Sequence, residues 1–299
     1  MLKLVDGGLL MTIDTKHPFV AQVDLIYAGL MDAAASAPEQ GRELGLGGRL
    51  FYAGDLEGAG SALVVAANIG GAATLVASSD LASQKQAIRE GVIDFLVNSL
   101  DEALRILKNE IRKGDTVAVC VSQSPDEVEN QMAERGVLPD LLPPGAQDAP
   151  RFQTFFDQGV RQIEPTQAKE DQAVLSWNVA SAQTHWLPRL DAIAAECLGS
   201  SESSDLRSAR RWLRLAPRYL GRLAQGVRLL RCDACAAQSF VERVREQVES
   251  REIAVAVEIE LSSHEDSKVH NFFPPQAHEL AQRSKAAGRQ QHRSGPTIP

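Results

Sequence analysis

Between residues 50 and 142, short apolar segments alternate with segments that have the hydrophobic period of a helix. The alternation predicts strands at residues 50–53, 73–77, 92–97, 116–121 and 138–142, and helices at 60–69, 82–90, 100–114 and 125–136. Strands that are apolar along their whole length, each followed by a helix, are typical of a parallel sheet buried on both faces. We therefore expect an α/β fold with a Rossmann-like parallel sheet and helices on both faces.

The first predicted strand ends in a glycine-rich turn. Gly54, Gly58 and Gly60 lie in this turn, and Ser61 follows in a helix of small residues. A strand, a glycine turn and a helix in this order present backbone N–H groups to a nucleotide pyrophosphate. The spacing G-x3-G-x-G differs from the usual G-x-G-x-x-G, and Glu57 would repel a phosphate. The four residues are therefore candidate cofactor-binding residues, and a tight turn without a ligand is the alternative.

Ser78 directly follows the second predicted strand, with Asp80 two residues later. A carboxylate at this point of a dinucleotide-binding domain reads the 2′-hydroxyl of a ribose. An acidic residue directly before a helix is equally a common N-cap. Ser78 and Asp80 are thus further candidate cofactor-binding residues, with capping of the next helix as the alternative for Asp80.

The rest of the chain has a different character. Residues 1–48 read as an N-terminal extension and linker, and residues 49–165 as the Rossmann-like domain. From residue 166 to 280 helical patterns dominate, with one strand near 251–261 predicted from alternating apolar residues, so we expect a mainly helical C-terminal region. Residues 281–299 are polar and basic and are predicted to be a disordered tail.

Cysteine and histidine residues offer two further candidate sites. Cys232 and Cys235 form a C-x-x-C motif, which is typical of a redox pair or of half a zinc site. The alternative is that both are small apolar residues at or near the start of a helix. His264, His270 and His278 match no metal-binding template and suit solvent-exposed positions. We predict no metal site, and no catalytic residue can be assigned.

An arginine-rich helix is the strongest candidate interaction surface. Its apolar residues fall on one face and its arginines on the other: Arg207, Arg210, Arg211, Arg214, Arg218 and Arg222. This arginine face suits an acidic partner, nucleic acid, an anionic membrane surface or a second copy of the chain. The alternative is a helix that packs on the rest of the protein, with its arginines solvated or paired with aspartate and glutamate.

Charge and hydropathy argue against a nucleic-acid-binding protein and against a membrane-spanning protein. The formal net charge of −8 argues against nucleic acid as a partner, and no apolar run approaches the roughly 20 residues that cross a bilayer. We expect a cytoplasmic protein without a membrane segment. A homo-oligomer is a possible assembly of this chain.

The segment from about Gly48 to Gly159 resembles the NAD-binding core of urocanase (urocanate hydratase). The resemblance rests on four stretches in the family's order: GRLFYAGDLEGAGSALVVAANIGGA, LVASSDLASQKQAIREGVID, NSLDEALRILK and QMAERGVLPDLLPPGAQ. It implies a Rossmann-like cofactor domain with NAD as its cofactor. In the family, the nicotinamide ring of tightly held NAD acts as an electrophile toward the imidazole of urocanate during water addition.

The sequence departs from the family pattern at several positions. Ser61-Ala62-Leu63 stands where the family has Gly-Ala-Gln, and Ser78 aligns with the acidic residue that contacts a ribose. Residues 143–146, Pro-Pro-Gly-Ala, replace an Asp-Gln-Thr-Ser motif, and the segment with the family's active-site cysteine is not found.

Three functions remain open from the sequence. The first is a urocanase-like protein that keeps the NAD-binding-type domain and lacks hydratase catalysis. The second is an atypical urocanate hydratase, a lyase of histidine degradation. The third is a non-enzymatic interaction scaffold that uses the arginine face.

Overall fold

The computed structural model describes residues 17–36, 44–164, 166, 172–199, 203–263 and 267–274. Residues 1–16, the predicted tail at 281–299, His264 and His278 lie outside this part of the chain. The chain divides into two compact units, and it crosses between them three times. Unit 1 consists of residues 1–168 and 202–225, and unit 2 of residues 169–201 and 226–299.

Unit 1 contains a six-stranded parallel sheet in the order β3-β4-β2-β1-β5-β6. Its strands are β1 (Leu50–Asp55), β2 (Ala73–Ala77), β3 (Phe95–Val97), β4 (Val117–Val121), β5 (Leu141–Leu142) and β6 (Arg161–Gln162). The central strands are in continuous register, from Ala73 beside Val117 to Ala77 beside Val121. Because β2 and β4 are buried at every residue, the sheet must be covered on both faces.

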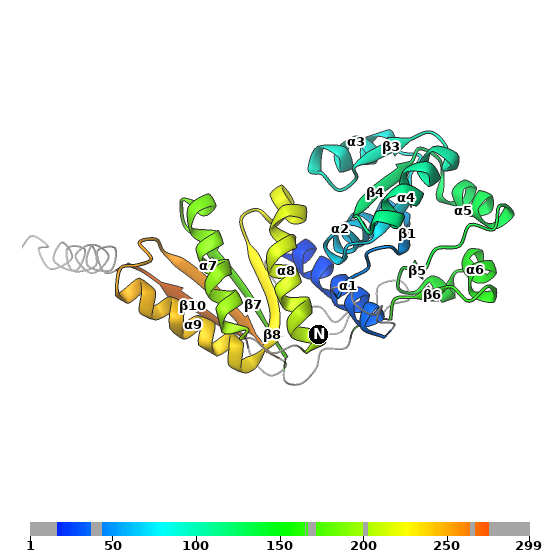
Figure 1. Ribbon diagram of the computed structural model, residues 1–299. Helices are drawn as coiled ribbons and strands as arrows, with labels where there is room; N and C mark the ends of the chain where they lie inside the picture. The colour runs from blue at the N-terminus through cyan, green and yellow to red at the C-terminus, as the bar shows by residue number, and fades with distance from the viewer. Residues whose placement is uncertain are drawn as a thin grey trace, which may run out of the picture. The chain divides into compact units, whose positions relative to one another are not determined.

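Helices follow the strands of unit 1 in the predicted alternation. They are α1 (Pro18–Ala35), α2 (Gly60–Gly70), α3 (Leu81–Glu90), α4 (Leu100–Lys113), α5 (Pro125–Glu134), α6 (Gln153–Asp157) and α8 (Ser204–Leu220), with short 3-10 turns at Ala146–Asp148, Pro150–Phe152 and Gly221–Ala224. Helices α4 and α5 cover one face of the sheet and α2 packs on the other (Figure 1). The predicted α/β fold with a Rossmann-like parallel sheet is confirmed.

The apolar core on the α4 and α5 face fixes these helices. Alternate strand residues, among them Tyr52, Leu75 and Val119, point toward this face and meet Leu107 of α4 and Met132 of α5. All five side chains are buried. Burial of each large apolar side chain contributes roughly 1.5–3 kcal/mol before entropic costs, so this layer contributes substantially to the stability of unit 1.

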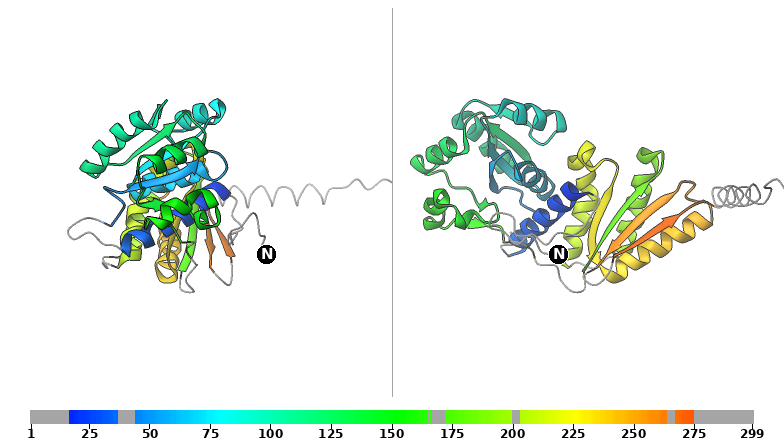
Figure 2. Two further views of the ribbon diagram at one scale, coloured as in Figure 1. Left: turned by 90° about the vertical axis from the view of Figure 1, so that its right-hand side faces the viewer. Right: turned by 180° about the vertical axis from the view of Figure 1, so that it is seen from behind.

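The opposite face has an additional helical layer that the sequence did not indicate. Helix α1, expected as part of an N-terminal extension, packs against α2, and both lie side by side in Figures 1 and 2. Helix α8 returns to unit 1 from later in the chain and packs on α1 and α2. The rings of Tyr27 on α1 and Trp212 on α8 lie 5.0 Å apart, and the Tyr27 hydroxyl donates to the Ser208 carbonyl at 2.9 Å.

Unit 2 corrects the expectation of a mainly helical C-terminal region. It contains a four-stranded antiparallel sheet in the order β10-β9-β7-β8, with two helices. Its elements are β7 (Gln172–Val179), α7 (Gln183–Cys197), β8 (Arg228–Asp233), α9 (Ala234–Glu249), β9 (Val257–Ser262) and β10 (Ser267–Phe272). The strand expected near 251–261 is β9, which begins only at Val257.

One face of the unit 2 sheet carries both helices. Trp177 of β7 packs on Phe240 of α9, with ring centroids 4.9 Å apart, and α7 and α9 contact one another (Figure 1). Buried residues alternate along β7 because only one side of this strand faces the helices.

Among the described residues, no helix combines the length and the hydropathy that a bilayer crossing requires.

Candidate functional site

The carboxyl ends of the parallel strands in unit 1 meet at one edge of the sheet. Strand β1 has β2 on one side and β5 on the other, so the chain leaves β1 toward one half of the sheet and later returns to the other half. Ligands of open α/β sheets bind outside the carboxyl ends of the strands at such a reversal. The segments after β1 and β2, which contain every candidate cofactor-binding residue, reach this edge.

The turn between β1 and α2 is built tightly around its glycines. Gly54 and Gly58 have φ values of +77° and +60°, in the left-handed region that favours glycine. A Cβ atom at Gly60 would lie 1.9 Å from the carbonyl oxygen of Asp55, so only glycine fits there. The Asp55 side chain accepts a hydrogen bond from the backbone N–H of Glu57 at 3.0 Å, which fixes the chain between the glycines.

Helix α2 begins without the side-chain cap that its neighbours have. Asp80, Ser99 and Ser124 accept hydrogen bonds from backbone N–H groups at the starts of α3, α4 and α5. No side chain caps α2, and its first turn contains no acidic residue. The hydroxyl of Ser61 donates to the carbonyl of Leu56 at 3.4 Å, so it faces back into the turn. The Gly60 N–H donates to the Glu57 carbonyl at 3.0 Å, so an anion at the positive end of α2 would depend on the N–H groups that follow it.

The carboxyl ends of β2 and β4 are joined by a buried glutamine. The Gln84 side-chain amide donates to the Ser78 carbonyl at 2.7 Å and to the Ser122 hydroxyl at 3.0 Å. Ser78 is almost fully buried, and its hydroxyl accepts from the N–H of Asp80 at 3.1 Å. The role of Gln84 was not predicted from the sequence. Its spacing of three residues from the buried Ala87 on α3 was the only indication that its side chain faces inward.

Asp80 is the N-cap of α3. Its carboxylate accepts from the N–H of Ser83 at 2.7 Å, and this hydrogen bonding holds the pKa of Asp80 below its ordinary value. The carboxyl group is fully exposed beyond the end of β2. The sequence left two roles open for Asp80, a ribose contact and an N-cap, and the structure shows the N-cap.

Residues 26–171 match the family model described as Urocanase Rossmann-like domain. Unit 1 contains a urocanase Rossmann-like domain. The predicted resemblance is confirmed, and the match extends beyond the segment from Gly48 to Gly159 on both sides. It begins within α1, runs past β6, covers just under half of the chain and leaves out α8.

A buried polar network stabilises the urocanase Rossmann-like domain beside β1. The Tyr52 hydroxyl donates to Glu129 Oε1 of α5 at 3.0 Å, and Arg151 Nε lies 3.4 Å from Glu129 Oε2. Burial raises the pKa of the Glu129 carboxyl above its ordinary value, and the nearby Asp126 and Asp55 add to the rise. Burial, together with Glu129, also raises the pKa of Tyr52. No pattern in the sequence predicted this network.

Two acidic residues lie in or next to the glycine turn of this domain, and their charge opposes the binding of an anion there. Asp55 ends β1, and Glu57 is exposed next to Gly58. A bound diphosphate would thus rely on backbone N–H groups of α2 rather than on basic side chains. The glycine pattern and the uncapped helix favour such a ligand, and the two carboxylates oppose it.

The first four residues of the loop after β5 have no polar side chain. Pro143 and Ala146 form a turn in which the Ala146 N–H donates to the Pro143 carbonyl at 3.3 Å, and Gly145 has a φ of +78°. This is the loop that stands where the family has its Asp-Gln-Thr-Ser motif. It therefore supplies a tight turn at the carboxyl edge and no acid, amide or hydroxyl group between residues 143 and 146.

The other candidate groups lie in unit 2, outside the matched domain. Cys232 is buried at the end of β8, where burial raises the pKa of its thiol to about 12, whereas Cys235 is exposed on α9. A thiol with a raised pKa is a poor nucleophile, which favours the apolar interpretation of Cys232 over a redox pair. His270 stacks on Phe272 of β10. No group of three potential ligands for a metal ion occurs in the part of the chain that the structure describes.

Proposed function

We propose that the urocanase Rossmann-like domain binds NAD at the carboxyl edge of its sheet and that the chain lacks hydratase catalysis of its own. The pyrophosphate would lie at the start of α2, and the adenosine ribose beside Ser78 and Asp80. The turn between β1 and α2 carries this proposal. Nothing lies within 4 Å of a Cβ built at Gly58, so the space outside the turn is open, and the first N–H groups of α2 have no side-chain cap. Both features fit a diphosphate.

NAD supplies an electrophilic nicotinamide ring in urocanases, and this chain's residues would bind and orient the cofactor. Gly58 and Gly60 would allow close approach of the backbone, and the dipole of α2 would favour the negative charge. The exposed carboxylate of Asp80 would accept a ribose hydroxyl while it caps α3. Its charge would disfavour a 2′-phosphate, so we expect NAD to bind more tightly than NADP.

The variant Ala59→Asp tests this site. Ala59 is the exposed N-cap residue of α2, so a carboxylate there would occupy the position of the phosphate. Two charges 4 Å apart near a protein surface interact by about 4 kcal/mol, so NAD affinity should fall at least about tenfold. The melting temperature of the free protein should not fall, because an acidic group favours the start of a helix by about 0.3–1 kcal/mol.

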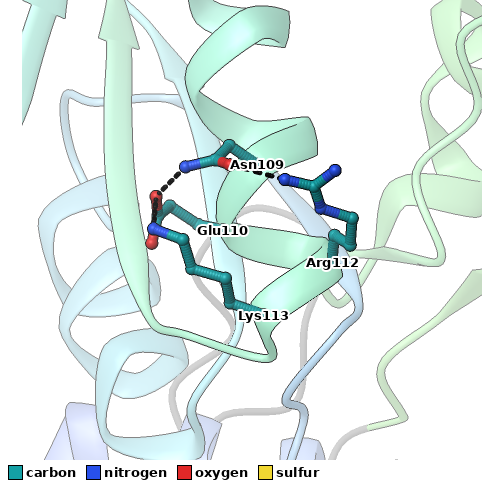
Figure 3. A network of polar contacts seen from close by, with 4 residues as sticks. All are labelled: Asn109, Glu110, Arg112 and Lys113. Carbon is teal, nitrogen blue, oxygen red and sulfur yellow. Dashed lines mark hydrogen bonds and ion pairs between the residues drawn. The ribbon is translucent and has the colours of Figure 1, made fainter.

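Asn109→Asp is the matched control, because it adds the same charge at the far end of α4. Asn109 belongs to an exposed network in which it donates to Glu110 and accepts from Arg112, while Lys113 pairs with Glu110 at 2.8 Å (Figure 3). NAD binding, measured by titration calorimetry and by NAD released on acid treatment, should be unchanged in this variant. An equal loss of affinity in both variants, or no NAD binding by the wild-type protein, would contradict the proposal.

Loss of hydratase catalysis is tested separately. The proposal rests on the loop at residues 143–146, which has no polar side chain where the family has its Asp-Gln-Thr-Ser motif. Urocanate absorbance should stay constant when the protein, saturated with NAD, is incubated at high concentration. A decrease proportional to the protein concentration would establish the alternative, an atypical urocanate hydratase.

A further inference from the structure

Helix α8 and the turn after it concentrate positive charge in an otherwise acidic chain. Residues 206–225 contain six arginines and no aspartate or glutamate, although the whole chain has a formal net charge of −8. The sequence placed all six arginines on a single face. The structure assigns them different environments, and this difference identifies the part of the surface that is able to bind a partner.

Arg211 is a structural residue. Its Nε donates to the carbonyl of Ile69 in the last turn of α2 at 2.9 Å, and Nη1 lies 3.4 Å from the carbonyl of Leu44. A Cβ at Gly71 would lie 2.4 Å from Nη2, so the guanidinium fills the space beside that glycine. Arg211 therefore attaches α8 to the end of α2, where cations are favoured, and is not part of a docking surface.

The remaining exposed arginines form a line on the outer side of α8. Arg207, Arg214 and Arg218 lie at helical spacings of seven and four residues, and all three are exposed. The opposite side of the helix is buried through Trp212 and Leu213. Residues seven and four positions apart lie on the same side of a helix. Because the apolar side of α8 packs on unit 1, the side with these three arginines faces outward.

Two members of this line, and the arginine that follows it, have no acidic partner among the residues that the structure describes. Within the described ranges, no carboxylate pairs with Arg207, Arg218 or Arg222. Arg218 lies over the ring of Tyr219, 5.3 Å from its centroid, which holds its guanidinium in place. Exposed arginines held in position are suited to bidentate pairing with carboxylates.

We propose that the outer side of α8, with Arg207, Arg218 and Arg222 as the contacting residues, binds an acidic segment of a partner protein. Charge complementarity supports this partner, because the surface offers three guanidinium groups that pair with no carboxylate in the described part of the chain. The net charge of −8 disfavours a long polyanion such as nucleic acid, because its many phosphates would be repelled by a chain that is negative as a whole. A short acidic segment contacts the arginines alone.

Fluorescence anisotropy with a labelled peptide of twelve glutamates tests the proposal on the full chain. The variant R207Q/R218Q should weaken binding about tenfold or more at an ionic strength of about 0.15 M. The control R105Q/R112Q removes the same charge from two exposed arginines of α4 and should change the affinity less than about twofold. NAD binding should be equal in all three proteins, which separates this proposal from the function of the matched domain.

Three results would overturn the proposal: no peptide binding by the wild-type protein, an equal loss in the control, or tighter binding of a twelve-residue oligothymidylate than of the peptide. If R207Q/R218Q lowers the melting temperature, the single variant R222Q in the turn after α8 provides the second test. R222Q should weaken peptide binding severalfold, and unchanged affinity would count against the surface.

Discussion

Replacement of Tyr52 by phenylalanine isolates one bond of the buried network beside β1. The hydroxyl donates to Glu129 at 3.0 Å, and both residues are buried. The ring contact with Phe152, with centroids 6.2 Å apart, does not need the hydroxyl, so the packing should persist. A hydrogen bond to a charged group contributes about 1.5–3 kcal/mol. Because Arg151 still faces the other carboxylate oxygen at 3.4 Å, we expect a loss near the lower end, about 1.5–2 kcal/mol.

Tyr27→Phe is the matched control within the same unit. The Tyr27 hydroxyl donates to the neutral carbonyl of Ser208 at 2.9 Å, a bond that contributes about 0.5–1.5 kcal/mol. Hydrogen exchange of peptides from β1 and β2 measures the opening of unit 1 by itself. At pH 8, exchange should become roughly 10- to 30-fold faster in Tyr52→Phe, since about 1.4 kcal/mol corresponds to a factor of ten.

The pH dependence gives the same variant a second, independent result. Burial raises the pKa of Glu129 above its ordinary value of 4.5, so the folded state binds this proton more tightly than the unfolded state. Between the two pKa values, wild-type stability therefore falls as the pH rises. The Tyr52 hydroxyl lowers the pKa of Glu129, so its removal should cost more at pH 8 than at pH 4.5. Equal losses at both values, or a loss at pH 8 no greater than that of Tyr27→Phe, would refute the reasoning.

Three further outcomes can be measured. Gly60→Ala should cost more than about 4 kcal/mol, seen as lost folded signal in thermal unfolding by circular dichroism, because the new Cβ would lie 1.9 Å from the Asp55 carbonyl oxygen. Arg211→Gln should lower the free energy of unfolding by about 1.5–3 kcal/mol in urea titration, because α2 loses a charged donor at its carboxyl end. A thiol reagent should modify the exposed Cys235 in the folded protein and reach Cys232, whose pKa burial raises to about 12, only after unfolding.

Local patterns in the sequence were sufficient to predict the parallel sheet. The apolar run at residues 73–77 is β2 as predicted, and the run at 116–121 contains β4 (Val117–Val121). Ser99 stands directly before the helix predicted at 100–114 and is its N-cap, with its hydroxyl accepting from the Glu102 N–H at 3.3 Å. These features depend on neighbouring residues, which is the range over which a sequence pattern is informative. The predicted strand at 92–97 is shorter and begins only at Phe95, because the Val92 N–H donates to the Ala87 carbonyl at 2.8 Å and so belongs to the end of α3.

Contacts between distant segments could not be predicted in this way. In the structure, every second residue of β7 from Ala173 to Val179 is buried. The sequence around this strand has helical patterns, so the strand and the sheet of unit 2 were not predicted. In the candidate site, the capping role of Asp80 follows from its place before α3, whereas Gln84 reaches Ser122 across 38 positions of the chain. The Arg211 side chain is held by the carbonyl of Ile69, 142 positions earlier in the chain. The amphipathic pattern of its own helix contains no information about this contact and predicted an exposed side chain.

The return of α8 to unit 1 has a consequence for biosynthesis. A nascent chain that has left the ribosome only as far as β6 contains the complete six-stranded sheet, but the Tyr27 side of α1 and the carboxyl end of α2 still await Trp212 and Arg211. Until α8 emerges, that apolar surface is open to chaperones or to aggregation. A truncated gene product that stops at the end of the matched family segment, residue 171, would keep this surface exposed permanently.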